Sequence, residues 1–228
     1  MRIRHYFVAL SVLGMILFSA GGVLAQDTTE TLTAGTFAAP YTPSADLCTT
    51  APMSTDDAAS LLATPTPLIE WEITANGIIA LPGGTAADEA TTTAVLTTLS
   101  QMWACNNAQN SAAILSLFSP EGLQMTAGVT EDSAWSYEEI RAAVAAKLTP
   151  EDPRAEADYA SIDAVVSVLL QADGTVGVLV LNSDPLLAEG DQVLDYFSFV
   201  NNGTSWQISR VALDPFDLTP DYGYEFGE

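Results

Sequence analysis

The apolar residues of this chain change their spacing near residue 160, and this change limits the fold more than any other feature. Between residues 85 and 150 they recur every three or four positions, as on helices, whereas between 162 and 213 they alternate, as on strands. Helices followed by strands predict an α+β fold in which the helices pack on one antiparallel sheet. The same order argues against the repeated strand–helix–strand units of a parallel sheet.

Two dipeptides divide the last third of the chain into hairpins. Asp173-Gly174 and Asn202-Gly203 are residues that two-residue β-turns prefer, and each lies between two alternating apolar segments. We expect at least four antiparallel strands, within residues 162–170, 176–181, 193–200 and 205–213. Asn202-Gly203-Thr204 also matches the N-glycosylation pattern, although the turn by itself explains these residues.

Symmetric pairing about these turns predicts which side chains face each other. About the first turn, Val168 faces Leu179, and both faces of the hairpin are apolar. In a sheet with one face exposed to water, polar and apolar residues would alternate along each strand. We therefore expect the second face to be covered, either by a second subunit or by the N-terminal extension. About the second turn, the pairs expected on one face are Phe199–Trp206, Phe197–Ile208 and Asp195–Arg210.

Short polar residues mark where the helices begin. Ser54, Thr85 and Ser136 are each followed three residues later by an acidic residue, which is the capping-box pattern. We expect helices over 54–63, 85–107, 112–118 and 136–148, with Pro120 and Gly122 ending the third. Residues 68–73 and 77–81 are expected to be extended. One stripe is expected on the helix over 85–107, with Val95, Leu99, Met102 and Asn106, and another on the helix over 136–148, with Ile140, Val144 and Leu148.

Residues 1–25 have the pattern of a secretory signal peptide. Arg2 and Arg4 precede an apolar run at 6–18, and short residues precede the expected cleavage after Ala25. An uncleaved anchor is the alternative, because the apolar run approaches the length of a membrane span. Export predicts a protein that is secreted or held in the cell envelope, and cleavage would leave it without a membrane segment.

The charge of the chain excludes several functions. The sequence has 29 acidic and 6 basic residues, and removal of the signal leaves four basic residues, hence a net charge of −25. Such a chain is a poor partner for nucleic acid, which needs clustered Lys and Arg. The signal also contains His5, the only histidine. We therefore expect no Ser-His-Asp or Cys-His catalysis and no metal bound by imidazole. We also expect the protein to use no other metal and no organic cofactor.

Two cysteines remain in the mature chain, Cys48 and Cys105. In an oxidising compartment they are expected to form a disulfide that ties the N-terminal extension to the main domain. A reactive thiol is the alternative, but it would need a neighbouring base that the sequence hardly offers.

Three segments carry a resemblance to a known family. They are WACNNAQNSAAILSLFSPEGL at 103–123, SYEEIRAAV at 136–144 and DYFSFVNNGTSWQISRV at 195–211. Their order across residues 85–213 resembles the NTF2-like superfamily, which includes SnoaL-like cyclases and ketosteroid isomerases. The resemblance implies a cone in which three helices pack on a curved antiparallel sheet. The extension with its cysteine resembles secreted bacterial members.

The resemblance also suggests how the chain is divided. Residues 26–84 would be a Thr/Ala/Pro-rich spacer, flexible over 26–46, followed by the rest of the N-terminal extension. Residues 85–213 would be the NTF2-like domain. Residues 214–228 would be an acidic aromatic tail, which is either an extended arm, an adhesive segment or disordered.

The family includes enzymes, ligand binders and interaction domains, so the resemblance does not assign an activity. In the family, the final hairpin and two helices line the cone. We therefore expect a site for a small apolar ligand, with binding favoured over catalysis. Its candidate residues are Trp103, Asp195, Phe197, Phe199, Trp206 and Arg210. An ordinary cross-strand ion pair between Asp195 and Arg210 is the simpler alternative.

Two other functions remain open. One is a carboxylate-dependent isomerase, cyclase or hydrolase that uses Asp163 or Asp195 with Tyr159 or Tyr196. Its catalytic residues cannot be transferred from the family, because Asn110 stands where the family often has an acid. The other is an envelope interaction protein without a pocket. A homodimer through the convex face of the sheet is compatible with each function.

Overall fold

A computed structural model of the chain describes residues 40–64, 71–75, 78–127, 135–149, 151–185 and 192–215. The predicted signal peptide at 1–25, the spacer up to residue 39 and the tail from residue 216 lie outside the described residues. The described residues all belong to one compact unit.

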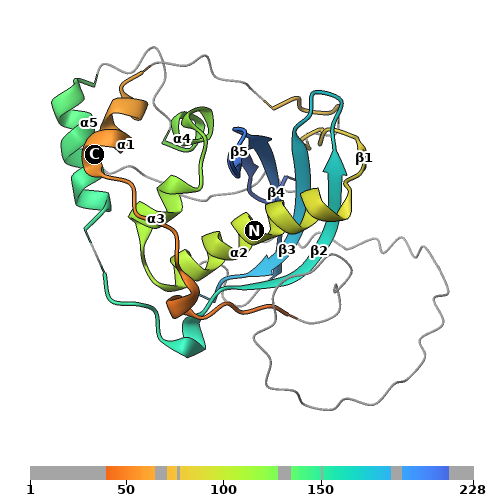
Figure 1. Cartoon of the computed structure of the whole chain (residues 1–228), viewed down its shortest axis with the longest axis horizontal. Coiled ribbons are helices and arrows are strands. Elements are labelled where there is room, and N and C mark those ends of the chain that lie inside the picture. Colours follow the sequence, from red (N-terminus) through yellow and green to blue (C-terminus); the bar gives the residue numbers. More distant parts are fainter. Residues whose placement is uncertain are drawn as a thin grey trace, which may run out of the picture. The chain divides into compact units, whose positions relative to one another are not determined.

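Within the described residues, five strands form one antiparallel sheet in which each strand pairs with the next along the chain (Figure 1). The strands are β1 (Thr85–Ala86), β2 (Ser161–Leu170), β3 (Val176–Ser183), β4 (Gln192–Asn201) and β5 (Trp206–Ala212). Four of these strands follow the run of helices, which confirms the predicted α+β class, although the short strand β1 precedes most of the helices.

One α-helix of the described residues precedes β1, and the other α-helices lie between β1 and β2. They are α1 (Thr55–Leu62), α2 (Glu89–Asn107), α3 (Ser111–Ser116), α4 (Pro120–Ala127) and α5 (Tyr137–Lys147), with short 3₁₀ helices η1 (Ala45–Leu47) and η2 (Glu156–Asp158). Helix α2 contacts the sheet at β2 and β5, α4 packs on β5, and α5 packs chiefly on α1 (Figure 1). The sheet therefore carries α2 and α4, whereas α5 belongs to a second layer with α1.

The core lies between α2 and the inner face of the sheet, which is the face turned toward that helix. Trp103 of α2 meets Phe197 of β4 edge-on, with 5.5 Å between the ring centroids. Buried side chains of the same cluster include Val95, Leu96, Leu99, Val176, Val178, Val180, Phe199 and Ile208. Burial of these apolar surfaces is the main term that holds α2 on the sheet.

Several helix signals are confirmed. Ser54 caps α1 by accepting a hydrogen bond from the Asp57 amide, and Ser136 and Glu139 make the full capping box of α5. The predicted stripe of α5 is buried at Ile140 and Val144.

The start of α2 differs from its prediction. Thr85 lies in β1 opposite Leu170, and the helix cap is Asp88, whose carboxylate accepts a hydrogen bond from the Thr91 amide at 2.7 Å. That bond, with a second from the Thr91 side chain, lowers the pKa of Asp88. Pairing with β2 takes Thr85 out of the helix, so the next suitable acceptor becomes the cap.

The stretch after α2 also differs from its prediction. Pro120 and Gly122 do not end a helix over 112–118; α3 ends at Ser116, and Pro120 begins α4. Proline suits the first turn of a helix because it needs no amide donor there. Gly122 allows a close approach to β5, since a Cβ atom at this position would lie 2.3 Å from the Ile208 carbonyl oxygen.

The register of the first hairpin is shifted by one residue from the expected pairing. Val168 faces Val178, not Leu179. The loop contains three residues, and of these only Gly174 has positive φ, at 85°. A two-residue type I′ turn would need positive φ at both central residues, so the chain adopts the three-residue loop with glycine in the left-handed position.

The second hairpin also departs from its predicted register. Its turn contains residues 202–205, so that Phe199 faces Ile208, and a bulge in β5 then shifts the pairing again. Beyond the bulge, Phe197 faces Val211 and Ser198 faces Arg210. Asp195 and Arg210 are therefore not cross-strand partners.

The N-terminal extension covers part of the outer face of the sheet, as one of the two predictions proposed. Trp71 meets Tyr196 edge-on at 5.8 Å, and the Arg210 guanidinium lies 3.7 Å from the centre of the Trp71 ring. The next residues make a small antiparallel bridge between Ile73 and Ile79. At these two residues the bridge agrees with the predicted extended structure, whereas residues 68–70 and 77 lie outside the described part of the chain.

Residues 40–46 are not a free spacer. Tyr41 exchanges two backbone hydrogen bonds with Ile162 of β2, at 2.7 and 2.8 Å. Its hydroxyl also bonds to Ser100 of α2 at 2.8 Å. Pairing with a sheet edge satisfies backbone groups that a flexible spacer would leave to water.

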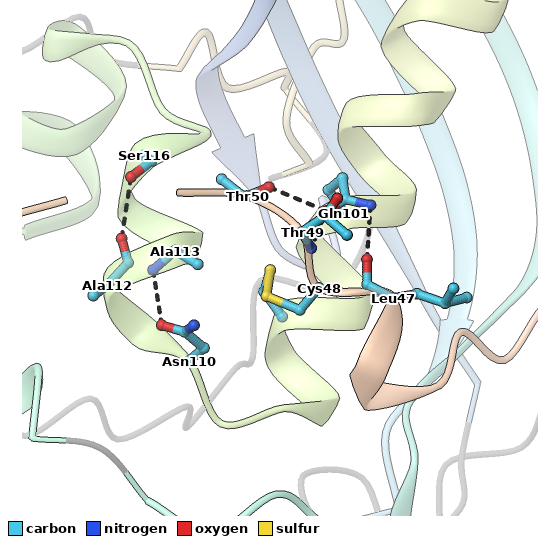
Figure 2. Close-up of a disulfide and its surroundings, with 10 residues drawn as sticks. Leu47, Cys48, Thr49, Thr50, Gln101, Asn110, Ala112, Ala113 and Ser116 are labelled. Atoms are coloured by element: carbon cyan, nitrogen blue, oxygen red, sulfur yellow. Dashed lines mark hydrogen bonds between the residues drawn. A yellow bond between two sulfur atoms is a disulfide. The ribbon is translucent and has the colours of Figure 1, made fainter. Parts of the chain in front are cut away.

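The predicted disulfide between Cys48 and Cys105 is present (Figure 2). One turn earlier on α2, Gln101 donates a hydrogen bond to the Leu47 carbonyl and accepts bonds from Thr49 and Thr50. Residues four apart lie on the same helix face, so the covalent bond and the hydrogen bonds hold the same short segment of the extension.

Candidate functional site

The inner face of the sheet changes from apolar to polar toward one end. Successive pairs of facing residues on β3 and β4 are Val176–Phe199, Val178–Phe197, Val180–Asp195 and Asn182–Val193. Asp195 therefore lies one row beyond the aromatic pair of β4, on the face that α2 covers.

Asp195 is a buried carboxyl group with two donors. Its Oδ2 accepts a hydrogen bond from Asn182 Nδ2 at 2.9 Å, and its Oδ1 accepts one from the backbone amide of Asp214 at 3.0 Å. Burial raises the pKa of Asp195, and the two hydrogen bonds oppose this rise. Asp195 thus keeps a proton to a higher pH than an exposed aspartate does.

A buried ion pair lies beyond the end of β3. Arg154 donates a hydrogen bond to Asp184 at 2.7 Å, and the side chains are only 8% and 10% exposed. Asn106, at the end of α2, donates to Asp184 and accepts from Arg154. With its amide turned to satisfy both neighbours, Gln109 accepts a bond from Arg154 and donates one to Glu151. Removing one partner of such a network lowers stability strongly, because it leaves a buried charge without its partner.

Asn107 joins three segments next to this ion pair. Its Nδ2 donates to the carbonyls of Pro43 and Ala160, at 2.8 and 3.1 Å, and its Oδ1 accepts from the Ala160 amide at 2.8 Å. The side chain is fully buried. The C-terminal end of α2 thereby ties the extension to the start of β2.

The structure brings most of the predicted ligand residues to the inner face but separates one from them. Trp103, Phe197 and Phe199 are buried in the core, and Trp206 packs against it. Arg210 faces Ser198 and stacks on Trp71, on the outer face. The expected Asp195–Arg210 pair is therefore wrong, because the longer turn and the bulge change which residues meet.

Asp163, the other candidate base, lies on the outer face. A bulge in β2 separates it from Val165, which is buried on the inner side. Its carboxylate accepts hydrogen bonds from Ser161, Ser183 and Gln192, at 2.9, 2.5 and 2.9 Å. These bonds engage both oxygens in holding the end of the sheet together.

The two candidate tyrosines are also engaged. Gln171 bonds to the hydroxyl of Tyr196 at 2.5 Å, and burial raises the pKa of this tyrosine. The hydroxyl of Tyr159 accepts a bond from the Ala45 amide at 3.5 Å. Tyr196 lies on the outer face, so it does not share a site with Asp195.

In the part of the chain that the structure describes, no three or more His, Cys, Asp or Glu side chains are grouped to hold a metal ion. None of the helices described is both long and apolar enough to cross a bilayer.

No protein-family model, curated protein or solved structure matches this chain.

Sequence reasoning missed the buried polar network at the end of α2. The pairing of Arg154 with Asp184 joins residues thirty positions apart, and no local pattern indicates it. A signal is present in Asn106-Asn107, which we assign from the sequence to the end of a helix and, for Asn106, to its stripe. In a chain with few basic residues, an arginine outside the regular elements is also a candidate for a buried pair.

Proposed function

We propose that this chain is an exported NTF2-like domain that binds a small apolar ligand on the inner side of its sheet. Trp103, Phe197 and Phe199 would supply apolar contacts. Asp195, at the end of their row, would supply the polar anchor. Ligand sites commonly combine an apolar lining with a few polar groups.

One observation carries this proposal: a buried carboxyl group with a raised pKa adjoins an aromatic row on the same face. The other candidate acid and both candidate tyrosines are committed to bonds elsewhere. This leaves Asp195 as the candidate anchor among them, and it favours recognition over multi-residue catalysis.

The test is a titration of the mature, disulfide-bonded chain with a panel of small apolar alcohols and ketones. It would be followed by backbone NMR and native mass spectrometry. We expect one ligand per chain, with shifts centred on Trp103 and Phe197. The Asp195→Asn variant should weaken binding, whereas Asp152→Asn, at an exposed position, should not. Shifts confined to the outer face, or no saturable binding, would contradict the proposal.

A carboxylate-dependent enzyme is the second candidate, and the pKa of Asp195 is the observation that favours it. A base that titrates closer to neutral pH transfers protons more efficiently than an ordinary aspartate. A β,γ-unsaturated ketone would test for proton transfer next to a carbonyl. Isomerisation that is lost in Asp195→Asn would support the enzyme, and a rate equal to that of buffer would reject it for this reaction.

We further propose that a second copy of the chain covers the part of the outer face that the extension leaves open. Leu179, Leu181 and Leu194 are half-buried there, and Val166 of β2 is 55% exposed. Light scattering should report a dimer. The Leu181→Lys variant should dissociate it, whereas Thr97→Lys, on the exposed surface of α2, should leave it intact. A monomer at all concentrations would contradict this proposal.

A further inference from the structure

The turn between β4 and β5 places three hydrogen-bond donors on one amide oxygen. Asn202 Oδ1 accepts bonds from the Thr204 and Ser205 amides, both at 2.9 Å, and from the Thr204 hydroxyl at 2.8 Å. The whole turn is exposed to water. Gly203 follows Asn202 with φ of 93°, and the space where a Cβ atom would lie is empty.

We propose that Asn202 is a site of spontaneous conversion to aspartate and isoaspartate. The backbone nitrogen of Gly203 attacks Asn202 Cγ, the new N–Cγ bond closes a succinimide ring, and the Cγ–Nδ2 bond breaks. Nδ2 leaves as ammonia with the proton that Gly203 gives up. Water then opens the ring at Cγ to give aspartate, or at the backbone carbonyl to give isoaspartate. No oxidant, metal or enzyme is needed.

The three donors are placed where this reaction develops charge. Attack on Cγ moves negative charge onto Oδ1, and donors already aimed at that oxygen stabilise the tetrahedral intermediate, as in an oxyanion hole. Glycine adds no side chain to obstruct the approach, and water reaches the ring for hydrolysis.

One neighbour acts in the opposite direction. The Gly203 amide donates a hydrogen bond of 2.7 Å to Asn201 Oδ1. This bond stabilises the protonated nitrogen and must be lost before attack. Asn201 therefore slows the reaction that the donors on Asn202 favour, and the two effects can be separated by mutation.

Conversion would change the contact between β5 and α2. Isoaspartate at position 202 adds one carbon to the main chain of the turn, and this turn leads directly into Trp206. The Trp206 carbonyl accepts a hydrogen bond from Thr98 of α2 at 3.0 Å. A longer turn would strain this bond, so the isoaspartate form should unfold at a lower denaturant concentration.

The experiment is an incubation of the mature, disulfide-bonded protein in mildly alkaline buffer, followed by peptide mapping with isoaspartate detection. We expect the mass of the peptide containing Asn202 to change by the replacement of NH with O. The product should be a mixture of aspartate and isoaspartate. Thr204→Val should slow the conversion about fivefold, the equivalent of one hydrogen bond of about 1 kcal/mol, and Asn201→Ala should accelerate it. Asn202→Gln, which would need a larger ring, is the unreactive control.

Two outcomes would overturn the proposal. The first is an intact Asn202 in the folded protein under conditions in which the denatured chain converts completely. The second is equal rates in the folded wild type and folded Thr204→Val, which would show that the donors do not act on the reaction. Circular dichroism of each variant before incubation would confirm that folded proteins are compared.

Discussion

At the scale of single residues, Asn107 and Asp195 show how a few buried polar groups connect distant segments. Asn107 bonds to the backbone of Pro43 in the extension and of Ala160 just before β2. Asp195 bonds to Asn182 and to the chain that leaves β5. A buried polar group that loses its partners costs more than the bond itself contributed, so these positions should be sensitive to substitution.

Asn107→Ala should lower the free energy of unfolding by about 2–4 kcal/mol, because it removes three hydrogen bonds and leaves backbone groups of Pro43 and Ala160 without them. Urea denaturation followed by circular dichroism would measure the change. Thr93→Ala, at an exposed position of the same helix, should change stability by less than about 0.5 kcal/mol. Equal effects of the two variants would contradict the role of Asn107.

Asp195→Asn should change how stability depends on pH. Burial raises the folded-state pKa above the ordinary value of 3.8, so the folded protein holds this proton more tightly than the unfolded chain. The corresponding stabilisation is complete below pH 3.8 and is lost as the pH rises through the folded-state pKa. The asparagine variant lacks this loss, so it should gain stability relative to wild type as the pH rises toward neutrality. Parallel stability curves of the two proteins would contradict this expectation.

At the scale of elements, short loops and bulges decide which faces meet. The β4–β5 turn, with the bulge that follows in β5, moves Arg210 away from Asp195 and places it on Trp71. The bulge in β2 similarly places Asp163 on the outer face and Val165 in the core. Because side chains alternate along a strand, an insertion of one residue reverses every later position.

Gly122→Ala tests the contact between α4 and β5. Alanine favours a helix more than glycine does, so the substitution would stabilise an isolated helix. Here the new Cβ would lie 2.3 Å from the Ile208 carbonyl oxygen, and we expect a net loss of about 1–3 kcal/mol. Gly83→Ala, with no atom within 4 Å of the new Cβ, is the matched control. Greater stability of Gly122→Ala in thermal unfolding would disprove the close contact.

At the scale of the whole molecule, the extension is part of the folded unit. Residues 40–64 pair with β2, bond to α2 and, through Arg141 and Asp56, join α5. The disulfide closes a loop between cysteines 57 positions apart. Crosslinking restricts the unfolded chain more strongly than the folded one, in which these contacts already hold the segment.

Replacing both cysteines with serine should lower the free energy of unfolding by about 4 kcal/mol, the chain-entropy value for a loop of this length. Guanidinium denaturation with and without reductant would measure the loss in wild type, and the double variant should not respond to reductant. Thiol titration of the unfolded, unreduced wild type should find no free thiol. Two thiols per chain would show that the bond does not form in the protein as made.

Local patterns were sufficient for the helix starts at Ser54 and Ser136, the end of α2, the position of the two hairpins after the helices and the pairing of the two cysteines, but not for β1 or α4. The helix and hairpin signals depend on residues close in sequence, and the disulfide was favoured because the chain has two cysteines in all. The sequence predicts that Pro120 ends a helix, whereas in the structure it begins α4, because proline can either stop a helix or begin one. Only its contact with β5 distinguishes the two.

The sequence alone determined the α+β class, since the spacing of apolar residues reports secondary structure directly. Tertiary structure decided the register of both hairpins, the separation of Arg210 from Asp195, and the pairing of Arg154 with Asp184. These features depend on loop conformation, bulges and desolvation, which arise when segments far apart in the chain pack together. A linear pattern can show that a residue is apolar or charged, but its partner is selected by the three-dimensional path of the whole chain.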